Sequence, residues 1–122
     1  MRDYKKINAW KRSHRFVLGI YTLTEKFPSD EKYGIISQLR CAALSVPTNI
    51  AEGCGRSTER ELVRFMDIAS GSASEVDYLL YLAMELKYID QDKYDRASNE
   101  LTEIRKMISG YIKTVRNATA NN

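Results

Sequence analysis

The feature that most constrains this sequence is an apolar pattern at helical spacing that runs from Leu62 to Leu86. Apolar or small side chains recur there every three or four residues, which places them on one face of an α-helix. Met66, Ala73 and Leu80 lie beside this line, so the face is broader than a two-helix seam requires. A helix of about 30 residues is about 45 Å long. We interpret Gly71, in its middle, as a close-packing position.

The segment before this helix predicts a second helix and a tight turn. Pro47 lacks an N–H group, so we expect the helix that contains it to bend. Gly53 or Gly55 can adopt the left-handed conformation that ends a helix. Ser57 or Thr58 can then cap the next helix, with Glu61 three residues after Thr58 to complete a capping box. The pattern predicts two antiparallel helices that are joined by a short connection.

Two further helical patterns complete the chain. Asn8 can cap the first helix, which ends before the Phe27–Pro28 break, and Asp90 or Asp92 can cap the last. No segment shows the alternation of a strand. We predict an all-α, antiparallel up-down-up-down four-helix bundle that forms a single domain over residues 1–122. The expected helices span about 8–26, 31–52, 58–87 and 92–116, followed by a frayed polar tail over 117–122.

Composition limits the class of protein. Of 122 residues, 43% are hydrophobic and 29% are charged, which is typical of a folded soluble chain. No apolar run approaches the ~20 residues of a membrane span, and none follows the N-terminus as in a signal peptide. We therefore expect a cytoplasmic protein without a membrane partner. Cys41 and Cys54 lack the spacing of a zinc site or redox pair, so we expect reduced thiols, with Cys41 buried.

The net charge is only +3, but the predicted topology distributes the charged residues unevenly between the two ends of the bundle. The chain start, the Gly53–Arg56 turn and the end of the last helix must lie at one end, which collects eleven basic and four acidic residues. The opposite end collects four basic and seven acidic residues. Such a basic end suits RNA phosphates, although a merely solvated surface explains it as well. The candidate RNA-binding residues are Arg2, Lys5, Lys6, Arg12, Arg56, Arg60 and Arg64.

Catalytic and metal chemistry find little support in the sequence. His14 is the only histidine, so the Glu-x-x-His pairs of di-iron bundles are missing, and we expect no metal, cofactor or small-molecule substrate. His14 falls on the apolar stripe of the first helix and is interpreted as a core or interface residue. Glu52 stands at a helix C-terminus, where an anion is disfavoured. We expect it to pair with Arg40 or Arg56 or to reach the next helix, in a polar cluster with Asn49.

One string also resembles a known family. The matching positions are Leu39–Arg40, Ala42–Ala43, Ser45–Gly53, Ile68–Ser72 and Glu75, together with Trp10–Lys11 and Phe27–Pro28. Within them, Ser45, Pro47, Asn49, Glu52 and Gly53 form a motif to which we assign a structural role. This pattern resembles the bacterial 23S rRNA-intervening-sequence proteins. The resemblance implies a ring-shaped homopentamer without established catalytic residues, sometimes encoded within insertions in the large ribosomal RNA gene.

These observations lead to two hypotheses. The first is a non-enzymatic, self-assembling bundle that binds RNA, with ribosomal RNA as one candidate, through its basic end. The broad face of the third helix and the small residues Ala42, Ala43 and Ser45 are its candidate self-contact surfaces. The second is a structural or adaptor module that does not touch nucleic acid, for instance a partner of a polymerase or reverse transcriptase. The resemblance suggests this partner, because a related retroelement accessory protein works with a reverse transcriptase.

Overall fold

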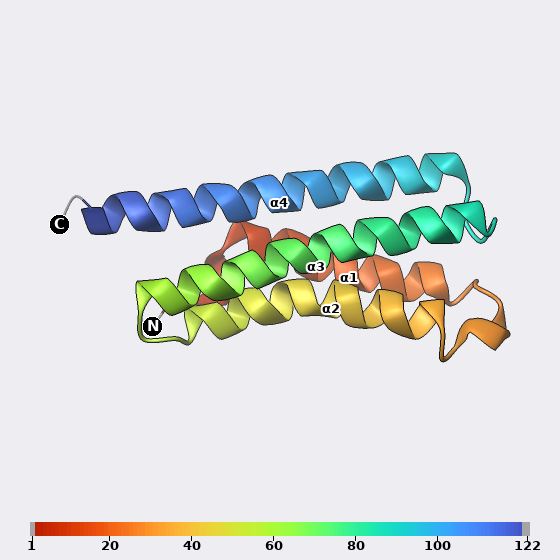
Figure 1. The fold of residues 1–122 in the computed structure, drawn as a ribbon, viewed down its shortest axis with the longest axis horizontal. Helices are drawn as coiled ribbons and strands as arrows, with labels where there is room; N and C mark the ends of the chain where they lie inside the picture. Colours follow the sequence, from red (N-terminus) through yellow and green to blue (C-terminus); the bar gives the residue numbers. More distant parts are fainter. Residues whose placement is uncertain (1, 121–122) are drawn as a thin grey trace.

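Four long helices alternate in direction along the chain (Figure 1). The computed structural model describes residues 2–120. The helices are α1 (Asn8–Thr24), α2 (Ile35–Cys54), α3 (Glu59–Glu85) and α4 (Gln91–Ala120), with short 3-10 helices at Tyr4–Lys6 and Ser29–Glu31. Consecutive helices pack side by side, whereas α1 and α4 meet less closely. The predicted all-α antiparallel four-helix bundle is confirmed.

The core-facing stripe of α3 runs through Leu62, Met66, Ala69, Ala73, Val76, Leu80 and Ala83, all fully buried. The predicted line shares Leu62, Ala69, Val76 and Ala83 with this stripe. Its other positions, Phe65, Ser72 and Leu79, follow the edge of the stripe and are half-buried, and Leu86 is exposed. The shift has a simple cause. Because α3 packs against both α2 and α4, the middle of its broad face, and not one edge, is the most deeply buried part.

The closest packing in the bundle is between α2 and α3. A Cβ atom placed on Gly53 would lie 3.1 Å from Cβ of Phe65 and 3.2 Å from the carbonyl oxygen of Leu62. The Ser45 and Ser72 hydroxyl groups share a hydrogen bond of 2.9 Å across the same interface. Gly53 is therefore needed for close approach.

Two predictions about small residues are corrected by this packing. Ala42 and Ala43 are buried within the bundle, and Ser45 is half-buried and bonded to α3, so this patch serves contacts inside one chain rather than a contact between chains. Gly71 is not a close-packing position, because nothing lies within 4 Å of a Cβ placed there. It lies on the exposed side of α3.

Each of the two longest helices is capped by one of the two residues that the sequence had offered for it. Thr58 Oγ1 accepts the N–H of Glu61 (3.1 Å) at the start of α3. Asp90 Oδ1 accepts the N–H of Lys93 (2.8 Å) at the start of α4. The predicted Asn8 cap is wrong, because Asn8 is already the first residue of α1 and the preceding 3-10 helix carries the chain into it.

Left-handed backbone occurs at a different turn from the one predicted. Gly55 ends α2 with φ −86°, and no glycine among the described residues has a positive φ. Lys87 instead adopts φ 67° after α3. The N–H of Tyr88 bonds to the carbonyl of Ala83 and that of Lys87 to Met84, each at 2.9 Å. This is a Schellman motif with lysine at the position that usually holds glycine.

Of the predicted helix boundaries only the start of α1 is exact; α2 begins and α4 ends four residues from the prediction, and the other boundaries differ by one or two residues. Helix α1 ends at Thr24 rather than residue 26, and α2 begins at Ile35 rather than residue 31. Gly34, with φ −106° and ψ −117°, separates the 3-10 helix from α2. Helix α4 continues through 117–120, where a frayed tail was predicted, since the alanines there favour helix. Residues 121–122 of that tail lie outside the described residues.

Candidate nucleic-acid interface

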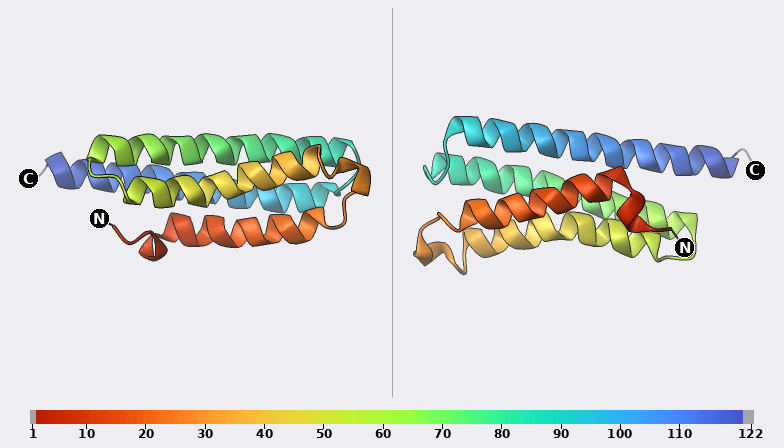
Figure 2. Two further views of the ribbon diagram at one scale, coloured as in Figure 1. Left: turned by 90° about the horizontal axis from the view of Figure 1, so that it is seen from below. Right: turned by 180° about the vertical axis from the view of Figure 1, so that it is seen from behind.

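The first residues of the chain lie against the α2–α3 turn (Figures 1 and 2). The N–H of Arg2 donates to the carbonyl of Cys54 at 3.3 Å. The C-terminal end of α4 lies at the same end of the bundle. The topological argument made from the sequence is therefore confirmed: three segments that are far apart in the chain meet at one end.

Six of the seven predicted RNA-binding residues gather at this end, and all six side chains are exposed. We call this set the basic pole. Its members are Arg2, Lys5, Lys6, Arg56, Arg60 and Arg64. Arg56 and Arg64 both lie over the ring of Phe65, at 4.7 and 5.5 Å from its centroid. The Phe65 ring thus holds two guanidinium groups near each other.

Acidic neighbours neutralise only part of the basic pole. Arg56 pairs with Glu52 (2.8 Å) and Arg64 with Glu61 (3.3 Å). These side chains are 43–64% exposed, so water and salt weaken both pairs. Within residues 2–120, no acidic group lies within ion-pair distance of Arg2, Lys5, Lys6 or Arg60. These four cations remain available to an anionic partner.

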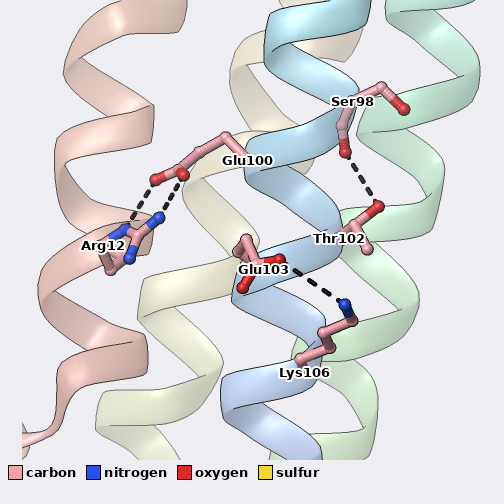
Figure 3. A network of polar contacts seen from close by, with 6 residues as sticks. All are labelled: Arg12, Ser98, Glu100, Thr102, Glu103 and Lys106. Carbon is pink, nitrogen blue, oxygen red and sulfur yellow. Dashed lines mark hydrogen bonds and ion pairs between the residues drawn. The ribbon is translucent and has the colours of Figure 1, made fainter.

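Arg12 does not belong to the basic pole. It lies further along α1, where it forms a two-pronged ion pair with Glu100 of α4 (Figure 3). Its Nε donates to Glu100 Oε2 at 2.8 Å and its Nη2 to Oε1. The hydrogen bonds from Arg12 lower the pKa of the Glu100 carboxyl, although partial burial opposes this. Arg12 therefore links two helices, a role that residue type alone did not distinguish from phosphate binding.

The residues of the predicted structural motif divide into two groups. The side-chain amide of Asn49 donates to both the carbonyl and the hydroxyl of Ser45, each at 2.8 Å, and Ser45 continues the network into α3. Pro47 is buried inside α2. Glu52 does not join Asn49, because its side chain points to Arg56 at the surface. The motif supports the α2–α3 contact and supplies one charge to the edge of the basic pole.

Three aromatic residues next to the basic pole were not recognised from the sequence. Tyr4 meets the edge of Trp10 at 5.0 Å, and Trp10 stacks on His14 at 4.9 Å with the ring planes 5° apart. His14 is exposed, so of its two interpretations the core residue is wrong and the interface residue stays a prediction. The four-residue spacing of Trp10 and His14 could have indicated this stack. Tyr4 joins it only through the fold of the chain start.

The predicted burial of Cys41 is wrong. Cys41 is exposed, whereas Cys54 is buried beneath the chain start. Burial raises the pKa of the Cys54 thiol. The described part of the chain holds no cluster of three or more His, Cys, Asp or Glu side chains that could bind a metal ion. Among the described helices, none is both long and apolar enough to cross a membrane.

An open groove separates α1 from α4. Phe16, Ile20, Leu23 and Ala97 give it an apolar floor, and Arg15 and Lys93 stand among its basic lining residues.

Comparison with known proteins agrees with the resemblance seen in the sequence. The profile of the 23S rRNA-intervening sequence protein family matches residues 5–110. The chain belongs to this family. A crystal structure of a family protein supports the fold: it is a protein with unknown function from the S23 ribosomal protein family of Bacteroides thetaiotaomicron, with a TM-score of 0.79 at 24% identity. The match covers 86% of this chain and 98% of that one. No curated protein sequence matches this chain.

Family membership assigns a fold and an ancestry but no activity, since the matched structure is itself described as having unknown function. The matched region begins at Lys5 and extends into α4. It therefore includes the motif of α2 and almost all of the basic pole.

Proposed function

We propose that this protein is a non-enzymatic, self-assembling four-helix bundle that binds RNA through its basic pole, with ribosomal RNA as one candidate ligand. The observation that carries the proposal is the meeting of the chain start and the α2–α3 turn, which brings six exposed cations to one end. Phosphate groups are the complementary ligand for such a surface. Each neutralised phosphate releases counterions, so binding is expected to weaken steeply with salt.

Self-assembly would strengthen the positive electrostatic potential of the basic pole. In a ring of identical copies, the basic poles lie on one face, and a modest charge per chain becomes a strong combined potential. Exposed apolar side chains on α3, such as Ile68, Tyr78 and Tyr81, offer one contact surface between copies. Light scattering tests this part directly, because it measures the molar mass in solution. We expect the mass of a pentamer, and a measured mass of 14.0 kDa, that of one chain, would refute self-assembly.

A salt titration with a charge-reversal variant tests RNA binding. Arg60→Glu replaces an exposed cation in the first turn of α3, where an acidic residue suits the helix dipole and the fold should be retained. We expect weaker binding and a slope of log K against log salt that is smaller by at least about one. Lys26→Glu makes the same change of charge at the opposite end and should have little effect.

The groove between α1 and α4 favours the second candidate function, an adaptor that binds another protein. Its apolar floor and basic rim suit an acidic amphipathic helix. The salt titration separates the two functions. Folded, assembled protein that binds no RNA at low salt would refute RNA binding and leave the adaptor.

A further inference from the structure

The three aromatic side chains beside the basic pole form one wall of a hollow between α1 and α2. Tyr4, Trp10 and His14 stand on one side, and Pro47, Thr48 and Glu52 of α2 on the other. Tyr4 and Trp10 are half-buried and pack against the core, so they are held firmly. His14 is exposed and stacks parallel to Trp10, so the stack ends in a ring accessible to solvent.

The hollow adjoins the basic pole on two sides. Lys5 stands 5.9 Å from the centroid of the Tyr4 ring. Glu52, on the α2 side, is bonded to Arg56. A nucleotide chain whose phosphates contact Lys5 and Arg56 would therefore pass beside the hollow.

We propose that this hollow binds an unpaired base of single-stranded RNA by stacking it on His14, as a continuation of the Trp10–His14 stack. This inference rests on the proposed RNA binding at the basic pole and specifies the kind of RNA. Unpaired bases stack on aromatic side chains, and each such contact strengthens binding about fivefold or more. Bases within a duplex are already stacked and paired, so they cannot enter the hollow.

The chemistry of the hollow suits a base better than a purely apolar ligand. Its aromatic wall supplies stacking, while the Thr48 hydroxyl and the Glu52 carboxylate can hydrogen-bond to a base edge. An i,i+4 aromatic pair also stabilises its own helix slightly. That smaller role would not require a hollow with polar groups opposite the rings.

Fluorescence offers a direct test, because Trp10 is the single tryptophan of the chain. The probes are a ten-nucleotide oligocytidylate and an RNA duplex of ten base pairs, titrated at low salt with the full-length protein. We expect the single strand to quench Trp10 as it binds, and the duplex to bind through phosphate contacts with little quenching.

Substitution of the exposed ring completes the test. His14→Ala should weaken single-strand binding about fivefold or more and leave duplex binding unchanged. His14→Phe keeps an aromatic face and should retain the binding. Tyr33→Ala is a matched control, since it removes a ring that is 87% exposed and lies far from the basic pole.

The outcomes distinguish base stacking in the hollow from the RNA binding at the basic pole on which it rests. Equal binding of both probes, with no effect of His14→Ala, would overturn base stacking while leaving phosphate binding intact. Failure of both probes to bind at low salt would overturn RNA binding and the hollow together.

Discussion

The ion pair between Arg12 and Glu100 gives a quantitative prediction about stability. It joins α1 to α4 where these helices otherwise meet loosely (Figure 3). Hydrogen bonds to charged groups contribute about 1.5–3 kcal/mol when shielded, whereas exposed ion pairs contribute about 0.2–1 kcal/mol. The two side chains are 31% and 34% exposed, so we expect a coupling energy between these limits, about 1 kcal/mol.

A double-mutant cycle of Arg12→Gln and Glu100→Gln measures this coupling. Unfolding entropy of about 2.1 cal/mol/K per residue means that 1 kcal/mol corresponds to about 4 °C in the melting temperature of a chain of this length. Thermal unfolding should be followed by circular dichroism at pH 7 and fixed protein concentration. The control is the Glu103–Lys106 pair, 3.6 Å apart and 52% and 70% exposed, whose coupling should stay below about 0.5 kcal/mol.

The pair should also depend on pH in one direction. Arg12 lowers the pKa of Glu100 below its ordinary value of 4.5 in the folded protein. The contribution of the pair is therefore complete above that ordinary value and is lost as the pH falls through the lowered folded pKa. The difference between wild type and Glu100→Gln should narrow in acid. A coupling at pH 7 no larger than that of the control pair would refute this reasoning.

Three further predictions concern single positions. Gly71→Ala should raise the free energy of unfolding by about 0.5–1 kcal/mol, since the space around Gly71 is open. Gly53→Val should lower the free energy of unfolding by about 1–3 kcal/mol, because the added side chain overpacks the α2–α3 contact. Urea unfolding measures both changes. Lys87→Gly should stabilise the protein by up to about 1 kcal/mol, because lysine is strained at φ 67°; an unchanged or lower melting temperature would contradict this. In native protein a thiol reagent should modify Cys41 rapidly and Cys54 only on unfolding, since burial raises the pKa of Cys54; equal rates would contradict its burial.

The sequence was sufficient for the fold because its helical signals are local and agree with one another. Apolar spacing identified all four helices, and the caps at Thr58 and Asp90 are fixed by side chains within three residues. The errors occurred at positions whose surroundings depend on a segment that is distant in the sequence. Gly53 faces α3 and has no room for a side chain, whereas Gly71 has open space around it. The sequence around each glycine does not show this difference.

The candidate site was predicted in part for the same reason. Topology alone brought the chain start to the α2–α3 turn, so the placement of six cations followed from helix order. The assignment of Arg12 failed because its partner, Glu100, is 88 residues away in the chain. The aromatic hollow escaped notice because the 3-10 helix that brings Tyr4 to Trp10 had no recognised signal.

The tight α2–α3 contact implies an order in which parts of the molecule open. Amide protons in these two helices should exchange with solvent only when the whole bundle unfolds, while α1 and α4 can each detach in a smaller, more frequent opening. A ligand that touches α1 and α2 at once binds only the closed form. By mass action, its presence must make the opening of α1 rarer and slow hydrogen exchange along α1.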